Sequence, residues 1–172
     1  MARIQYESDG LKIMEDLTNN ADQIQQRVLS EILTRNAATE YLKRFLNAQI
    51  DNQLFKKIVP IVSYEDIRPY IDRIANGEPS DILLADPVIE FHISTGTSGG
   101  KPKLIPATAD VLEKRVVFNT LLGSVMRKHV GDPNQGGKGL QFLFVKPEIE
   151  TPCGLKARAV STSALKDDTR SR

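Results

Sequence analysis

Residues 90–106 read EFHISTGTSGGKPKLIP. The first four continue an alternation of apolar and polar side chains that begins at Ile89, which predicts a strand. The next ten, residues 94–103, hold three glycines, four hydroxyl side chains and two lysines. Glycines let successive backbone N–H groups turn toward an anion, hydroxyl groups add donors, and lysine adds positive charge. This composition predicts a phosphate-binding loop at the end of a strand.

The loop does not fit a Walker motif. That motif needs four residues between its glycines, then Lys and Ser or Thr at the start of a helix. Here Lys101 is followed by Pro102, and the glycine spacing differs. The same residues also fit an ordinary solvated turn, because Gly-Gly is a common turn dipeptide. The loop residues alone leave both interpretations open.

The loop resembles that of adenylate-forming enzymes of the firefly-luciferase-like superfamily, Ser/Thr-Ser/Thr-Gly-Thr-Ser/Thr-Gly-x-x-Lys. With its flanks, residues 90–106 are similar to the plant auxin-responsive acyl-acid amido synthetases, the Gretchen Hagen family. Segments upstream also resemble the amino-terminal region of that family, and the similarity continues to about Ser163. These upstream segments are residues 34–37, 40–42, 55–67 and 74–81.

The resemblance implies a ligase that uses ATP. A carboxylate would attack the α-phosphate of ATP to give an acyl-adenylate and pyrophosphate, and the amine of an amino acid would then attack the acyl carbon and displace AMP. Backbone donors and lysine would neutralise the phosphate charge, and Mg²⁺ would arrive with ATP rather than in a protein-built cage. No catalytic residue is assigned. The ATP-binding residues implied by the resemblance are Ser94, Thr95, Gly96, Thr97, Ser98, Gly99, Gly100 and Lys103.

The acid substrate is less defined. The family places acyl-contacting side chains on the helix after the loop, here expected over residues 110–129. Auxin- and benzoate-using members have an arginine near the position of Leu122. Its absence leaves a jasmonate-like acid open beside the auxin and benzoate classes. Arg115 and Arg127 are off register, and we expect both to be solvated.

The chain of 172 residues is several times shorter than the family's catalytic unit. The later adenine- and ribose-binding segments of the family, and its mobile carboxy-terminal domain, have no counterpart in the sequence. We therefore expect a truncated synthetase that is inactive alone. Residues 1–163 would form a partial amino-terminal adenylation domain, and residues 164–172 a divergent, disordered tail.

Two other function classes stay open. One is a non-catalytic interaction or regulatory protein that pairs an exposed sheet edge with a full-length synthetase. The other, the weakest, is a nucleic-acid binder that uses Lys101, Lys103, Lys114 and Arg115. Lys and Arg number 23 against 22 Asp and Glu, so the charge favours neither nucleic acid nor an anionic membrane as a partner.

No apolar leader or spanning run is present, which predicts a cytoplasmic protein. The single cysteine, Cys153, is expected to be an idle thiol in a turn.

The pattern along the chain predicts an α/β fold, with a helix-rich first part and an incomplete sheet. Helices are expected after Asn20 and after Thr39, from about Arg68 to Asn76, and over 111–129, with a linker at 77–87. Leu140–Val145 is predicted as a strand. His92 lies on the polar side of the strand at 90–93, where we expect a solvated or hydrogen-bonded side chain rather than a ligand contact.

Overall fold

The computed structural model describes residues 2–96, 102–131, 142 and 145–163. They form two compact units. One contains residues up to Val28 and from Asp110 to Phe142, and the other contains Leu29–Ala109 and the residues from Leu143 onward. The elements are α1 (Ala2–Asn19), α2 (Ala21–Asn36), α3 (Glu40–Leu46), α4 (Asn52–Ile58), α5 (Tyr64–Ala75), a 3-10 turn η1 (Ser80–Ile82), β1 (Glu90–Ile93), β2 (Leu104–Ala107), α6 (Ala109–Val130), β3 (Ile149–Glu150) and β4 (Lys156–Ala159).

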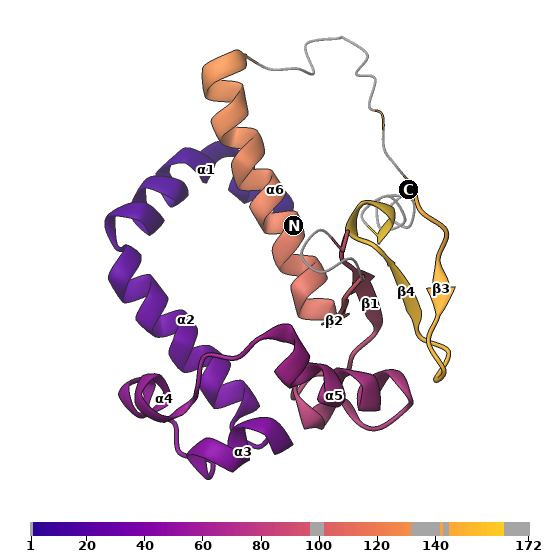
Figure 1. Cartoon of the computed structure of the whole chain (residues 1–172). Helices are drawn as coiled ribbons and strands as arrows, with labels where there is room; N and C mark the ends of the chain where they lie inside the picture. Colours follow the sequence, from indigo (N-terminus) through magenta and orange to yellow (C-terminus); the bar gives the residue numbers. More distant parts are fainter. Residues whose placement is uncertain (1, 97–101, 132–141, 143–144, 164–172) are drawn as a thin grey trace. The chain divides into compact units, whose positions relative to one another are not determined.

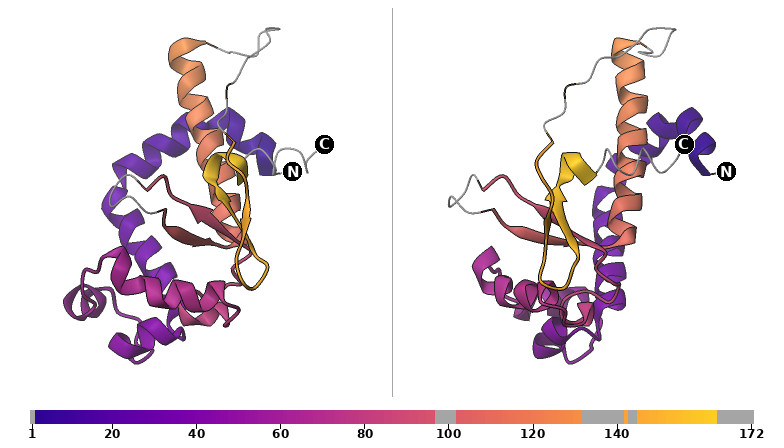
Figure 2. Two further views of the ribbon diagram at one scale, coloured as in Figure 1. Left: turned by 45° about the vertical axis from the view of Figure 1, so that its right-hand side comes forward. Right: turned by 90° about the vertical axis from the view of Figure 1, so that its right-hand side faces the viewer.

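The second unit contains a four-stranded sheet in the order β2-β1-β4-β3 (Figure 1). β1 pairs antiparallel with β2 and parallel with β4, and β3 pairs antiparallel with β4. Figure 2 shows β4, drawn in yellow, beside the β1–β2 hairpin in both views. The predicted strand at 90–93 and the α/β class are confirmed. The strand predicted at Leu140–Val145 lies mostly outside the described residues, and Phe142 and Val145 are not in a strand.

The two faces of the central strands differ in chemistry. Phe91 lies opposite Ala157 in the β1–β4 register, and both side chains are fully buried. They share the core with Ile71 and Ile74 of α5. On the other face His92 lies opposite Arg158. One face of the sheet therefore holds the apolar core, and the other carries polar side chains.

Helix α5 begins earlier than the sequence predicts. The sequence predicts a start near Arg68, but the helix starts at Tyr64 and holds Pro69 in its interior. A capping box explains the difference, because Asp66 Oδ2 accepts from the Ser63 N–H at 2.7 Å and from the Ser63 hydroxyl at 2.6 Å. Pro69 removes one backbone hydrogen bond, and the cap together with the apolar packing of the helix outweighs that loss.

Other helix ends agree with the sequence. Helix α2 starts directly after Asn20, and Thr39 caps α3 by accepting from the Leu42 N–H at 3.4 Å. Helix α5 ends at Ala75, and Gly77 follows in the left-handed region with φ of 104°. The stretch predicted as a linker contains η1 and buries Ile82 in the core. It is therefore part of the packed unit.

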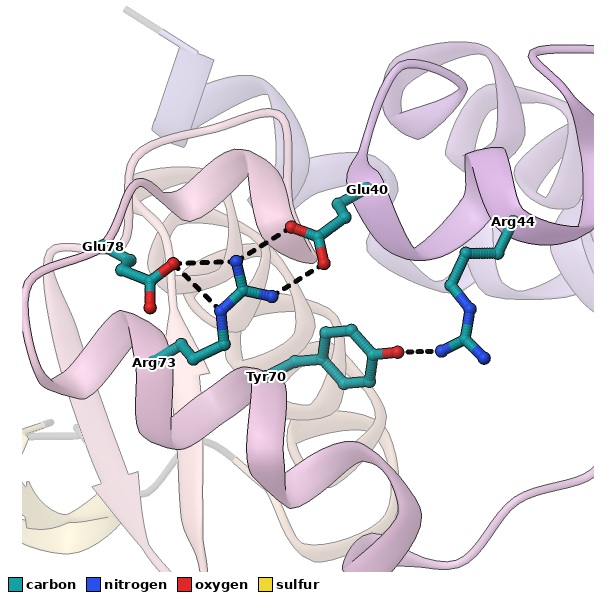
Figure 3. Close-up of polar contacts among 5 residues, drawn as sticks. All are labelled: Glu40, Arg44, Tyr70, Arg73 and Glu78. Carbon is teal, nitrogen blue, oxygen red and sulfur yellow. Dashed lines mark hydrogen bonds and ion pairs between the residues drawn. The ribbon is translucent and has the colours of Figure 1, made fainter.

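A cluster of charged side chains joins α3 to α5 (Figure 3). Arg73 makes a bidentate pair with Glu40, with N–O distances of 2.7 and 2.9 Å, and also contacts Glu78. The hydrogen bond from Arg73 holds the pKa of Glu40 below its ordinary value, and the two carboxylates raise the pKa of Arg73. Arg44 Nη1 donates to the Tyr70 hydroxyl in the same region. These contacts hold α3 against the carboxy-terminal half of α5.

The first unit contains α1 and α6, and α6 confirms the long helix predicted after the loop. Ser124 is buried at the point where α6 meets Gly10 of α1. Arg115 and Arg127 are half-buried, which corrects the expectation that both are solvated, and Arg127 donates to Ser124 Oγ at 3.3 Å. Within the described part of the chain, no helix has the length and apolarity needed to cross a bilayer.

Candidate phosphate-binding site

The two arms of the predicted loop are joined at its base. β1 leads directly into Ser94, and Lys103 immediately precedes β2. The Ser94 N–H donates to the Lys103 carbonyl at 3.0 Å, and the Lys103 N–H donates to Ser94 Oγ at 2.9 Å. We call these two residues the loop neck. The neck brings the first and last residues of the predicted phosphate site into direct contact.

The neck leaves useful donors available. Ser94 Oγ accepts a hydrogen bond from Lys103, so its own proton is still available for an anion. Thr95 is exposed, and Gly96 has a φ of 77°, in the left-handed region that glycine adopts without strain. Thr97, Ser98, Gly99 and Gly100 lie outside the described residues, so their part in the site stays a prediction.

The ammonium group of Lys103 lies over an aromatic ring. Its Nζ is 5.1 Å from the centroid of the Tyr64 ring, within the range of a cation–π contact. In the part of the chain that the structure describes, no carboxylate forms an ion pair with this lysine. An incoming anion therefore meets a cation that no described acid neutralises.

Tyr64 is a residue that the sequence did not single out for this site. Its hydroxyl accepts from the Leu104 N–H at 3.0 Å and lies 3.3 Å from the Leu104 carbonyl, to which it donates. The only signal in the sequence was the family resemblance of residues 55–67. Contact between residues 40 positions apart could not be inferred from local pattern.

A buried polar cluster lies on the polar face of β1. Glu90 and His92 are both under 10% exposed, so this side of the strand is covered rather than solvated. Glu90 Oε1 is 3.1 Å from His92 Nε2 and accepts from the Ser163 hydroxyl at 2.5 Å. Glu90 Oε2 is 3.3 Å from Arg158 Nε, an ion pair in which Nε makes no hydrogen bond to a described residue. The cluster ties β1 to β4, and the expectation of a hydrogen-bonded His92 is confirmed.

Cys153 lies in a turn, as predicted, with its thiol exposed. Thr151 Oγ1 is 3.3 Å from the sulfur, and this hydrogen bond lowers the pKa of the thiol. The Cys153 N–H donates to the carbonyl of Ala75 at 3.2 Å. The turn therefore closes against the end of α5.

Metal-binding residues do not gather in the described ranges. Among residues 2–96, 102–131 and 145–163, no three His, Cys, Asp or Glu side chains are placed to hold a metal ion. Binding of Mg²⁺ together with ATP remains a prediction.

The profile of the GH3 family N-terminal domain matches residues 10–171 of this chain. The chain belongs to the GH3 family. The match confirms the resemblance seen in the loop and its flanks. The matched range includes the loop neck.

GH3 relatives include the indole-3-acetic acid-amido synthetase GH3.17 of Arabidopsis thaliana, 52% identical over 159 residues. The 4-substituted benzoates-glutamate ligase GH3.12 of the same plant is 48% identical over 157 residues. Each alignment covers 91% of this chain and 26% or 27% of the relative. This chain thus spans about a quarter of the length of these GH3 relatives.

A solved GH3 structure has the same fold. The acyl acid amido synthetase AtGH3.15, of Arabidopsis thaliana, in complex with 2,4-DB superposes with a TM-score of 0.90 at 51% identity. The superposition covers 96% of this chain and 29% of that one. The incomplete sheet and the helix-rich first part are therefore the architecture of a GH3 amino-terminal region.

Proposed function

We propose that this chain forms the phosphate-binding part of an ATP-dependent acyl-acid amido synthetase. The observation that carries the proposal is the loop neck, in which Ser94 and Lys103 are held together by two hydrogen bonds. The neck lies between paired strands, as expected for a glycine-rich loop that cradles an anion. Membership of the GH3 family supports the choice of ATP, with Mg²⁺, as the polyphosphate.

The described residues suit distinct tasks in acid adenylation. The Ser94 hydroxyl would donate to a phosphate oxygen, Gly96 would let the backbone approach, and the Lys103 ammonium would offset negative charge. Thr95, Thr97, Ser98, Gly99 and Gly100 complete the proposed cradle on the resemblance of the sequence. The carboxylate, a poor electrophile, would attack the α-phosphate of ATP and release pyrophosphate, and an amino acid amine would then attack the acyl carbon of the acyl-adenylate and release AMP.

The proposed acid belongs to the hormone-like carboxylic acids of the auxin, benzoate or jasmonate class. Two relatives are named for indole-3-acetic acid and 4-substituted benzoates. Leu122 of α6 is partly exposed and apolar, at the position near which auxin- and benzoate-using members carry arginine. A leucine at this position lacks the charge of that arginine, which weakens the case for the auxin and benzoate classes and leaves the jasmonate class open.

Nucleotide binding tests the proposal directly. Equilibrium dialysis of the full 172-residue chain with MgATP should detect binding, and Lys103→Met should weaken it by about tenfold, since one charge-assisted contact is lost. Lys56→Met, an exposed lysine on α4, is the matched control and should leave the affinity unchanged. Failure of the unchanged chain to bind MgATP, or equal losses in both variants, would contradict the proposal.

Acid-dependent pyrophosphate release tests the activity itself. The chain is incubated with MgATP and one acid at a time from the auxin, benzoate and jasmonate classes. Release with one class above the acid-free rate supports catalysis by this chain. Nucleotide binding without release restricts the function to a binding module.

A second candidate is a non-catalytic protein that pairs with a full-length GH3 synthetase. The favouring observation is the short edge strand β3, whose Ile149 is more than half exposed. In the described sheet β3 has a partner on one side only, which suits strand addition. Sedimentation of the chain with a full-length synthetase, compared with an Ile149→Lys variant, tests it. Association that the variant reduces is expected, and no association would exclude this candidate.

A further inference from the structure

Tyr64 is fixed in place at the first position of α5. The capping box of Ser63 and Asp66 starts the helix at this residue, and hydrogen bonds to Ser63 hold the pKa of Asp66 below its ordinary value. The ring packs beside the core of the second unit. Tyr64 therefore has little freedom to leave its position beside β2.

The hydroxyl of Tyr64 holds the backbone next to the loop neck. Lys103 pairs with Ser94 across the hairpin, so the neighbouring residue, Leu104, directs its own N–H and carbonyl away from β1. Tyr64 occupies both groups with one hydroxyl, at 3.0 and 3.3 Å. A phenol can accept and donate at the same time, so the pairing is chemically complete.

The ring of the same residue holds the lysine side chain. Lys103 Nζ lies 5.1 Å from the Tyr64 ring centroid. A lysine side chain has several rotatable bonds, and a cation–π contact restricts them without neutralising the charge. Tyr64 thus contacts both the backbone that follows Lys103 and the ammonium group at the end of its side chain.

We propose that Tyr64 is a positioning residue for Lys103, through its hydroxyl on Leu104 and its ring under the ammonium group. The role rests on the proposed function, because it assigns Lys103 to the phosphates of ATP. Tyr64 itself touches no reacting atom. Tyr64 holds the ammonium group of Lys103 in position before the nucleotide binds. Binding therefore does not have to restrict an otherwise mobile lysine side chain.

Two substitutions separate the two contacts. Tyr64→Phe removes the hydroxyl and keeps the ring, and Tyr64→Leu removes both. Tyr41→Leu is the control, because the Tyr41 ring packs edge-on against Phe45 and Tyr70 in the same unit, rather than against Lys103 or Leu104. Thermal unfolding of all three variants identifies any that fail to fold.

Nuclear magnetic resonance without nucleotide tests the geometry. In the chain labelled with ¹³Cε-lysine, the Lys103 ε-protons, assigned with Lys103→Arg, should be shifted upfield by the ring. Tyr64→Phe should keep this shift and speed amide exchange at Leu104, while Tyr64→Leu should abolish the shift. An ε-proton shift that is unchanged in Tyr64→Leu would overturn the contact.

A double-mutant cycle with MgATP tests the role. Tyr64→Leu should weaken MgATP binding about two- to fivefold in the natural sequence, the range expected for a cation–π contact at a partly exposed site, and by less than about twofold in a Lys103→Met background. Equal losses in both backgrounds would overturn the positioning role, because Tyr64 would then act through the fold. Absence of MgATP binding by the unchanged chain would overturn the proposed function, and the positioning role with it.

Discussion

Gly10 of α1 lies so close to Ser124 of α6 that a β-carbon placed on Gly10 would come within 2.3 Å of Ser124 Oγ and 2.7 Å of its Cβ. Both distances are far below van der Waals contact. Glycine inside a helix normally costs about 0.5–1 kcal/mol relative to alanine, so this glycine is favoured only because the two helices approach so closely.

Gly10→Ala should destabilise the protein by about 1–3 kcal/mol, the usual cost of overpacking a buried contact. The measurement is the free energy of unfolding in urea. Ser124→Gly should rescue the variant, because it removes the atoms that the new methyl group meets. Gly123→Ala is the control on α6, where the nearest atom is Arg127 Nη1 at 3.6 Å, and it should stabilise by about 0.5–1 kcal/mol. Destabilisation by both alanines would contradict the contact.

Glu90→Gln should destabilise the second unit by about 1–3 kcal/mol, the usual cost of leaving buried polar groups incompletely paired. Glu90 is buried, and the change removes one of two carboxylates beside the Arg158 guanidinium, the other being Glu148, whose Oε1 lies 3.7 Å from Arg158 Nη1. Chemical denaturation of the single variants and of Glu90→Gln with Arg158→Met measures the coupling. Recovery of stability in the double variant is expected. Additive losses would show that the two residues act independently.

Arg73→Met should lower the midpoint of thermal unfolding near pH 7, and the loss should shrink in acid. The pKa of Glu40 is lower in the folded protein, so its pairing stabilises above the ordinary Glu pKa of about 4.3 and is lost as the pH falls through the folded value. Melting curves from pH 7 to pH 3 should show the two proteins converging. Lys57→Met, exposed on α4, should show no such convergence.

Salt provides an independent check on the same pair. Arg73 and Glu40 are both partly exposed, so their attraction is screened by ions. At pH 7 the difference in melting midpoint between the natural protein and Arg73→Met should fall in 1 M NaCl. A difference that is insensitive to both pH and salt would assign the role of Arg73 to packing of its aliphatic stem.

Thr151→Val should slow alkylation of Cys153 by iodoacetamide. The threonine hydroxyl lowers the pKa of the thiol, so its removal reduces the thiolate fraction at a given pH below the thiol pKa. The pH–rate profile between pH 6.5 and 10 should move toward higher pH, with a similar plateau. Ser161→Ala, outside the turn, is the control. A lower plateau rate, without a shift of the profile along the pH axis, would indicate that the substitution changes access of iodoacetamide to the sulfur.

Local sequence was sufficient for several elements. The alternation around Phe91 predicted β1, Thr39 predicted the start of α3, and Gly77 predicted the end of α5. Each of these elements depends on the conformational preference of one residue or on a short periodic pattern, so neighbouring residues in the sequence are enough to predict it. The predicted start of α5 near Arg68 is wrong, because the cap formed by Ser63 and Asp66 starts the helix ahead of Pro69.

The candidate site likewise has a part that the sequence predicted and a part that it did not. The composition of residues 94–103 and the resemblance of the flanks pointed to a phosphate loop, and the structure joins Ser94 to Lys103 at its neck. Tyr64 went unnoticed because its contacts lie 39 and 40 positions away, and the burial of Glu90 and His92 depends on Ser163 and Arg158.

The amino-acid sequence by itself therefore determined the family resemblance, the α/β class and the chemistry of the loop. Motifs and periodic patterns lie in the order of neighbouring residues, and the hydrogen-bond donors and charge of the loop belong to its glycine, hydroxyl and lysine residues wherever the chain folds. Only the tertiary structure decided three features. Tyr64 is the tyrosine that contacts Lys103, Glu90 and Arg158 are the charged residues that are buried, and Gly10 is the glycine that lets a second helix approach. These features arise from contacts between distant segments, whose energies depend on separation and burial that no local pattern encodes.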